Sequence, residues 1–221
     1  MIREVNVKEI TENIKEMCIE ANYTLSPDMD KAMKKAAEEE KSELGTKILN
    51  QLQENLVIAD SEKIPICQDT GMAVVFVDIG QEIHFTGGQL EEAIHEGVRQ
   101  GYTEGYLRKS VVKDPIERVN TKDNTPAIIH YNIVPGEKIK ITVAPKGFGS
   151  ENMSRIFMLK PADGIEGVKN AILTAVKDAG PNACPPMVIG VGIGGTFEKS
   201  AILAKKALTR NLEEPSEIPY V

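Results

Sequence analysis

Four consecutive residues of different chemistry stand out between Pro65 and Gly71. They are the thiol of Cys67, the carboxamide of Gln68, the carboxylate of Asp69 and the hydroxyl of Thr70. Because proline fixes its own φ and glycine permits a positive φ, residues 64–71 are predicted to form a loop, called the motif loop below. An apolar run of strand length follows, so the loop stands at the mouth of a strand, where sites are commonly built. An Asx turn with Cys67 as a small buried hydrophobic residue explains the same pattern.

A second cysteine has a similar setting. Cys184 lies in Asn182-Ala183-Cys184-Pro185-Pro186, and because proline is excluded from helix interiors and central strands, its thiol is predicted to be displayed on a rigid turn. Thiolates on stiff loops suit a soft metal or an iron–sulfur cluster. The sequence has no C-x-x-C pair, which argues against a structural zinc site or a ferredoxin-type cluster. Cys18 lies on the apolar stripe of a predicted helix, which favours a buried core thiol.

The cations that an anionic substrate would need are concentrated in one long polar segment, residues 107–126, called the polar loop below. Its candidate cations are Arg108, Lys109, Lys113 and Arg118. Loops of this length in a compact domain are usually functional or disordered, so a positive pocket and a solvated charged loop both remain open. Residues 147–152, with glycines at alternate positions, predict a loop whose backbone N–H groups can cradle an anion.

The elements that must position these loops predict an α+β fold, with an N-terminal helical layer followed by a mixed sheet with packed helices. Hydrophobic periodicity predicts helices over 7–22, 27–40, 42–59, 89–106, 165–179 and 197–208, and strands over 73–80, 127–134, 138–144 and 187–196. Pro135-Gly136-Glu137 predicts a hairpin between the second and third strands. Met29 and Met33 are expected to face the core. We expect a single domain in which a helical layer at 1–60 precedes an α+β portion at 61–210 and a linker-like end at 211–221.

Composition narrows the class of protein. The 221 residues carry a formal net charge of −7, and nothing in the sequence resembles the dense basic footprint of a nucleic-acid-binding protein. No apolar run reaches the roughly 18 to 20 residues of a membrane-spanning helix. The N-terminus lacks the apolar core of a secretory signal, so we expect a cytoplasmic protein without membrane partners.

Glycines at 190, 192, 194 and 195 follow the last apolar run and invite a nucleotide-binding interpretation. Their spacing does not match G-x-G-x-x-G, and no lysine follows as in a P-loop. Close backbone packing, or backbone N–H groups presented to a site, explains the glycines equally well. A nucleotide-binding module using Gly190 to Gly195 is kept as the alternative from another functional class.

Taken together, the loops resemble the alpha subunit, or N-terminal part, of the class I iron–sulfur hydro-lyases, fumarate hydratase and L-tartrate dehydratase. The resemblance covers most of the chain from about residue 40 onward, and the order Cys-Gln-Asp-Thr-Gly then Ala-Cys-Pro-Pro is highly specific. The matching segments are Cys67-Gln68-Asp69-Thr70-Gly71, Leu107-Arg108-Lys109-Ser110, Asn120-Thr121, Asn124-Thr125-Pro126-Ala127, Lys146-Gly147-Phe148-Gly149-Ser150-Glu151-Asn152 and Asn182-Ala183-Cys184-Pro185-Pro186.

The resemblance implies an oxygen-sensitive [4Fe-4S] cluster held by three cysteines, with one iron open to act as a Lewis acid on the substrate. Cys67 and Cys184 would be two of the ligands, and the third is expected beyond Val221, so the chain would be a piece of an alpha subunit. Asp69 is the implied proton donor to the leaving hydroxide. The implied substrate-binding residues are Gln68, Arg108, Gly147, Gly149, Ser150 and Asn152.

The implied reaction is the reversible hydration of fumarate to (S)-malate, with dehydration of L-tartrate as the alternative. Removing water from a 2-hydroxy dicarboxylate needs an acid for the hydroxide and a base for the C3 proton, and this chain offers only the first. By the same resemblance the base belongs to a beta subunit, so the expected partner is that subunit in an oligomer. The chain alone is expected to be inactive. The loop at 146–152 looks closer to fumarase-type alpha chains.

Overall fold

The computed structural model describes residues 2–218, which form two compact units. The first runs from the N-terminus to Pro145 and includes the segment from Asn211 onward, and the second spans Lys146–Arg210. The helices before residue 63 therefore share a unit with the first sheet. The α+β class is confirmed, because helices accompany a mixed sheet.

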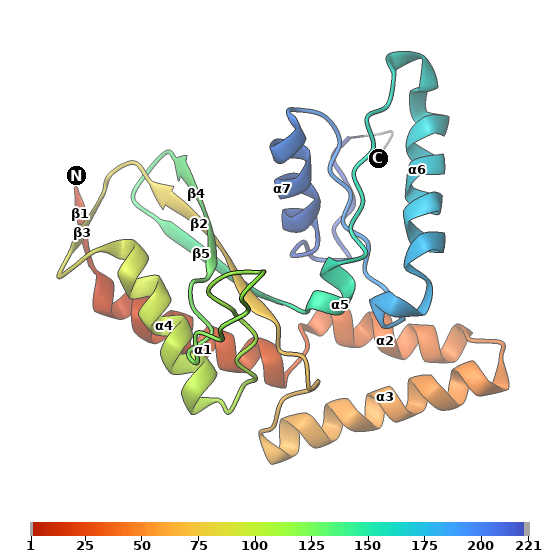
Figure 1. Cartoon of the computed structure of the whole chain (residues 1–221), viewed down its shortest axis with the longest axis horizontal. Coiled ribbons are helices and arrows are strands. Elements are labelled where there is room, and N and C mark those ends of the chain that lie inside the picture. Colours follow the sequence, from red (N-terminus) through yellow and green to blue (C-terminus); the bar gives the residue numbers. More distant parts are fainter. Residues whose placement is uncertain (1, 219–221) are drawn as a thin grey trace. The chain divides into compact units, whose positions relative to one another are not determined.

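The first unit contains two small sheets. Its elements are β1 (Arg3–Asn6), α1 (Val7–Tyr23), α2 (Pro27–Glu39), α3 (Glu43–Glu62), β2 (Met72–Gly80), β3 (Ile83–Thr86), α4 (Leu90–Glu104), β4 (Ile128–Val134) and β5 (Ile139–Lys146). β1 pairs with β3 in parallel, and β2 is flanked by β4 and β5 (Figure 1). β4 runs parallel to β2, with Ile128 opposite Val74.

The prediction of a hairpin between the strands now labelled β4 and β5 is wrong. The strand order is β4-β2-β5, so β2 lies between them. The connection passes the end of β2, where the Gly80 N–H donates to the Lys138 carbonyl at 2.8 Å. A Cβ on Gly80 would lie 2.3 Å from the Gly136 carbonyl oxygen, so glycine permits this close passage. Local turn residues could not reveal that a strand from about 50 residues upstream inserts between the two arms.

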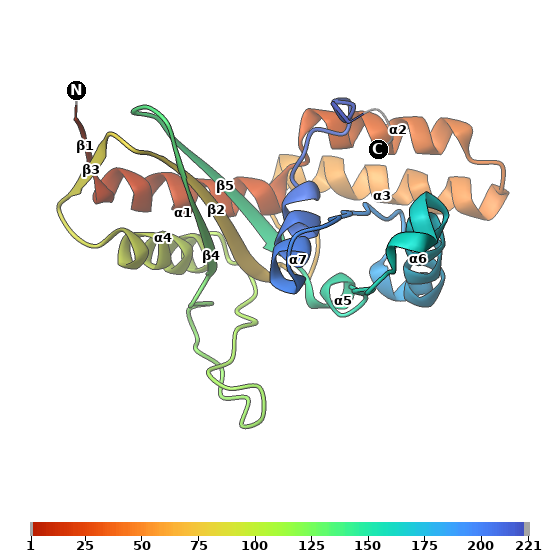
Figure 2. The same cartoon turned by 90° about the horizontal axis from the view of Figure 1, so that it is seen from above.

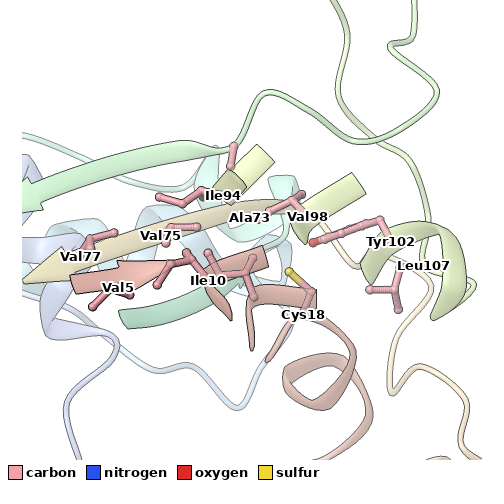
Figure 3. Packing of buried hydrophobic residues seen from close by; sticks show 12 residues of the cluster. Val5, Ile10, Cys18, Ala73, Val75, Val77, Ile94, Val98, Tyr102 and Leu107 are labelled. Atoms are coloured by element: carbon pink, nitrogen blue, oxygen red, sulfur yellow. The ribbon is translucent and has the colours of Figure 1, made fainter. Parts of the chain in front are cut away.

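One face of this sheet is covered by α1 and α4, which pack against each other. Ala73, Val75 and Val77 of β2 point to the same face because strand side chains alternate. They join buried residues of both helices in one cluster (Figure 3), which includes Ile10, Ile14, Cys18, Ile94, Val98 and Tyr102. Glycine in α4 allows the helices to approach closely, since a Cβ on Gly97 would lie 2.7 Å from the Thr11 carbonyl oxygen.

Cys18 lies inside this cluster, as predicted. Its side chain is 0% exposed, and burial raises the pKa of its thiol to about 12. The thiol therefore stays protonated and packs as a small apolar group.

α2 and α3 form a separate helical pair within the first unit (Figure 2). No residue of α2 is buried, so the prediction that Met29 and Met33 belong to the core is wrong; both are half-buried. α3 buries only Leu49 and Ala59. The helices of the expected N-terminal layer thus differ in burial: α1 belongs to the sheet core, and the α2–α3 pair contributes little to that core.

The second unit is built mainly from helices. Its elements are α5 (Phe148–Glu151), η1 (Pro161–Asp163), α6 (Gly164–Ala179), η2 (Gly180–Ala183) and α7 (Phe197–Ala207). The predicted strand over 187–196 is wrong, because this described segment contains no strand. It runs along α7 instead: a Cβ on Gly190 would lie 2.1 Å from the Ala204 carbonyl oxygen, and one on Gly192 the same distance from that of Ser200. Close packing therefore explains these two glycines. Among the helices described between residues 2 and 218, none has the length and apolar character needed to cross a bilayer.

Candidate active site

The motif loop leaves α3 and enters β2, as predicted. Its first half is anchored to two helices. The Ile66 N–H donates to the carbonyl of Asn22 in α1 at 2.8 Å, and the Asn55 amide of α3 donates to the Ile66 carbonyl at 2.9 Å. The loop is therefore fixed on the side that precedes its reactive residues.

The reactive residues themselves form a tight turn. The Gly71 N–H donates to Asp69 Oδ1 at 3.1 Å, and the Asp69 N–H donates to the Cys67 sulfur at 3.4 Å. The Asx turn considered from the sequence is therefore present. Cys67 is nevertheless exposed and not buried, and Gln68 is exposed beside it. Asp69 is half-buried, so the loop displays a thiol, an amide and a carboxylate in sequence.

Thr70 points inward and joins the motif loop to the polar loop. It is 3% exposed, and its hydroxyl accepts a hydrogen bond from the Arg108 N–H at 2.9 Å. The same hydroxyl donates to the Arg108 carbonyl at 3.2 Å. These two bonds place the backbone of Arg108 against the backbone next to Asp69, while the Arg108 side chain is exposed.

Tyr102 of α4 supports this junction from the core. Its hydroxyl donates to the Thr70 carbonyl at 2.8 Å, and the side chain is 0% exposed. Burial raises the pKa of the phenol well above its usual range, so Tyr102 keeps its proton and remains a donor.

Asn124 makes a second junction between the two loops. Its side chain is fully buried, and Oδ1 accepts hydrogen bonds from the Ser110 N–H at 2.7 Å and the Val111 N–H at 3.1 Å. Nδ2 donates to the Gly71 carbonyl at 3.0 Å. One amide thus satisfies three backbone groups drawn from the two loops.

The base of the polar loop is held by an ion pair. Arg99 of α4 donates from Nε to Asp123 Oδ2 at 2.9 Å and also binds Glu96. Asp123 Oδ1 accepts from the Thr125 N–H at 3.0 Å and from its hydroxyl at 2.8 Å. Burial alone would raise the pKa of Asp123, but the hydrogen bonds from Arg99 and Thr125 outweigh it and hold that pKa at about 2.

In the second unit, the prediction of a loop over 147–152 is wrong in one respect. Residues Phe148–Glu151 form the helical turn α5, and the N–H groups of Glu151 and Asn152 donate to carbonyls within that turn. Neither N–H group is therefore available to cradle an anion. Gly147 is half-buried, whereas Gly149, Ser150 and Asn152 are exposed, and the Lys146 ammonium donates to the Ser150 hydroxyl at 2.6 Å.

Cys184 is displayed on a turn, as its prolines predict. It follows η2 with a φ of 55°, its N–H donates to the Pro181 carbonyl at 3.1 Å, and its side chain is exposed. α5 lies beside this turn, because a Cβ on Gly149 would be 3.4 Å from the Asn182 carbonyl oxygen. The second unit thus brings the 147–152 segment and Cys184 together. The first unit places the backbone of Arg108 beside the motif loop that carries Cys67, Gln68 and Asp69.

Two of the three thiols suit a metal cluster. Cys67 and Cys184 are exposed on hydrogen-bonded turns, and thiolates are the donors that iron–sulfur clusters use, so both fit such a group. Cys18 does not fit, because it is buried and stays protonated. Within residues 2–218, no three His, Cys, Asp or Glu side chains are grouped as a complete metal site.

The sequence does not indicate that Tyr102 and Asn124, two residues that organise the site, belong to it. Tyr102 follows Val98 by one helical turn on the apolar face of α4, and a phenol in a core needs a hydrogen-bond partner. Asn124 falls in a segment that matches the family, but nothing local in the sequence indicates that its amide reaches Gly71, 53 residues upstream. The only local indication of its role is that Asn124 is a polar residue next to a turn.

Comparisons with known proteins identify the family. A family model described as fumarate hydratase (Fumerase) matches residues 11–221. The protein named "Putative L(+)-tartrate dehydratase subunit alpha" of Methanocaldococcus jannaschii is 42% identical over 212 residues, which covers 93% of this chain and 74% of the relative. L(+)-tartrate dehydratase subunit alpha of Escherichia coli UTI89 is 30% identical over 220 residues, covering 95% and 71%. The chain therefore belongs to the fumarate hydratase (Fumerase) family of hydro-lyases.

Proposed function

We propose that this chain is the alpha-subunit portion of an iron–sulfur hydro-lyase that interconverts fumarate and (S)-malate. The observation that carries the proposal is the junction at Thr70, whose hydroxyl bonds both the N–H and the carbonyl of Arg108. It joins a loop that displays Cys67, Gln68 and Asp69 to the residue best suited to bind a carboxylate. The proposed acid, Asp69, and the proposed carboxylate-binding residue, Arg108, therefore lie on loops whose backbones are in contact.

Each side chain has a separate task in this proposal. Arg108 is exposed, and its planar guanidinium can bind a substrate carboxylate through two parallel hydrogen bonds. Asp69 gives a proton to the departing hydroxide, since hydroxide is a poor leaving group without an acid. Gln68, exposed next to it, supplies an amide to orient the substrate oxygens.

Cys67 and Cys184 would hold the [4Fe-4S] cluster, with a third thiolate from outside residues 1–221. When bound, the cluster supplies an open iron that acts as a Lewis acid toward the substrate hydroxyl and carboxylate. Both cysteines are exposed, and the turns that carry them are hydrogen-bonded. The roles of Gly147 and Gly149 would be to leave room for the substrate, and Ser150 and Asn152 would contact it through their exposed side chains.

The substrate and partner follow from different observations. The segment Lys146-Gly147-Phe148-Gly149-Ser150-Glu151-Asn152 favours fumarate, whereas the names of the relatives favour L-tartrate as the alternative. Those relatives are named subunit alpha, which supports a beta subunit as the partner. We therefore propose a cytoplasmic oligomer in which the beta subunit provides the base that takes the C3 proton, so that the chain alone is inactive.

Anaerobic iron–sulfur reconstitution tests this function. The chain, and in parallel a longer alpha chain, is combined with a beta subunit of the same enzyme, and fumarate hydration is followed by absorbance. We expect hydration only when the longer alpha chain is combined with the partner, with loss of activity in Asp69→Asn and loss of the cluster's visible absorbance in Cys184→Ser. Asp178→Asn, the same substitution at an exposed site on α6, should leave activity unchanged.

Two results would contradict the proposal. One is fumarate hydration by the purified chain without a second polypeptide, which would remove the need for a beta subunit. The other is the absence of both cluster and activity in every combination. In the second case, stabilisation of the chain by ATP or NAD would support the nucleotide-binding module, although Gly190 and Gly192 are packed closely on α7.

A further inference from the structure

Asn124 belongs to the polar loop, and its side chain binds the backbone of both loops that carry the proposed site residues of the first unit. We propose that Asn124 is a positioning residue that sets the Arg108 side chain against the reactive residues of the motif loop. The choice of substrate in the test rests on the proposed function, whereas the bridge between the loops is a property of the chain itself.

The backbone groups that Asn124 binds lie close in sequence to the proposed site residues. Asn124 donates to the carbonyl of Gly71, two residues after Asp69. It accepts from the N–H of Ser110, two residues after Arg108, and from the next N–H. A shift of the amide would therefore move the proposed acid and the proposed carboxylate-binding residue relative to each other.

The bridge requires an amide. Asn presents an acceptor and a donor at the same end of a short side chain, and both are used here. An aspartate in its place would be isosteric but could not donate to the Gly71 carbonyl, and its negative charge would face that oxygen. Asn also tolerates the left-handed backbone found at this position, where φ is 62°.

The position of Asn124 is itself fixed from α4. The preceding residue, Asp123, is bound by Arg99 of that helix and by the N–H and hydroxyl of Thr125. The same helix supplies Tyr102, which donates to the carbonyl of Thr70. α4 therefore holds both loops, one through Tyr102 and the other through the ion pair next to Asn124.

A positioning role can be separated from a structural one because the loops have a second link. The Thr70 hydroxyl binds the backbone of Arg108 whether or not Asn124 is present. Loss of the Asn124 bridge should therefore leave the chain folded but loosen the placement of the guanidinium. Small misplacements of a substrate-positioning group can lower activity by about 100-fold.

The first test is a double-mutant cycle on the reconstituted assembly with its beta subunit. In the wild-type background, Asn124→Asp should lower kcat/KM for fumarate by roughly 10-fold or more, mainly through a higher KM. In an Arg108→Lys background the same substitution should lower kcat/KM much less, because a flexible ammonium does not depend on bidentate geometry. Equal losses in both backgrounds would overturn the positioning role. Asn13→Asp, at an exposed site on α1, is the matched control and should change neither value.

The second test needs no activity and so separates this inference from the proposed function. Amide hydrogen exchange is measured on the chain carrying Asn124→Asp or Asn13→Asp. We expect faster exchange across residues 66–72 in Asn124→Asp alone, with the core helices α1 and α4 unchanged. Wild-type exchange across 66–72 would contradict the bridge even if the enzyme hydrates fumarate. Faster exchange throughout α1 and α4 would show a structural role instead and would overturn the proposal.

Discussion

Replacing Tyr102 by phenylalanine removes one oxygen atom from the centre of the first unit. In the native chain this hydroxyl donates to the Thr70 carbonyl at 2.8 Å. Tyr102 is 0% exposed and Thr70 is 3% exposed, so water cannot easily replace the lost donor. The ring remains packed among Val98 and Cys18, which keeps the change confined to the hydrogen bond.

The magnitude follows from the burial of both partners. A buried carbonyl left without its donor costs about 1–3 kcal/mol, and we expect about 1.5 kcal/mol because the ring itself is retained. For a chain of this size, that corresponds to a decrease in Tm of about 3–6 °C. Tyr102→Phe should also lower kcat in the reconstituted enzyme, because Thr70 directly follows Asp69, the proposed proton donor.

Urea unfolding followed by circular dichroism measures this cost. The midpoint should fall while the m-value stays unchanged, since the surface exposed on unfolding is the same. Tyr106→Phe is the matched control, because Tyr106 is 87% exposed and should give a change within about 0.5 kcal/mol. The reasoning would be refuted if the two variants had equal unfolding free energies.

Other predictions follow from single features. Asp123 has a depressed pKa of about 2, so its carboxylate stabilises the fold above about pH 4 and loses this effect as the pH falls. Asp123→Asn should therefore lower the free energy of unfolding by about 1 kcal/mol at pH 6, and by less near pH 2.5, as measured by urea unfolding. Under anaerobic conditions without a cluster, the exposed thiols Cys67 and Cys184 should react with a disulfide reagent, and buried Cys18 only after unfolding. Gly192→Ala should lower the Tm, because its methyl group would meet the α7 backbone, and an unchanged Tm would contradict that contact.

The sequence predicted the elements that depend on local pattern. The apolar run after Gly71 is β2, and the helix with Ile94, Val98 and Tyr102 on one face is α4. The burial of Cys18 also followed from helical periodicity. In each case the spacing of apolar residues alone indicates which face is buried.

The sequence failed where distant segments decide the structure. β4 and β5 have turn residues between them, yet β2 separates them, and strand order is not a local property. The run over 187–196 has strand composition but packs Gly190 and Gly192 on α7 and contains no strand. Composition records the preference for extended backbone and not the partner that the backbone meets.

The candidate site shows the same division. The motif loop and the turn of Cys184 could be located from proline and glycine, because these residues restrict the backbone directly. The bonds from Thr70 to Arg108, and from Asn124 to Gly71, could not, since they join residues 38 and 53 positions apart. The prediction of a loop over 147–152 is wrong because a glycine followed by Ser and Glu also suits a single helical turn.

The most direct test of the proposed function compares two substrates on one preparation. The anaerobically reconstituted assembly of alpha chain and beta subunit is given (S)-malate and L-tartrate in turn, and the rate of water loss is measured for each. We predict a higher kcat/KM for (S)-malate, and a loss of both activities when Arg108 is changed to alanine. Failure to dehydrate either dicarboxylate, in a preparation whose cluster is fully loaded, would contradict the proposal that this chain is part of a dicarboxylate hydro-lyase.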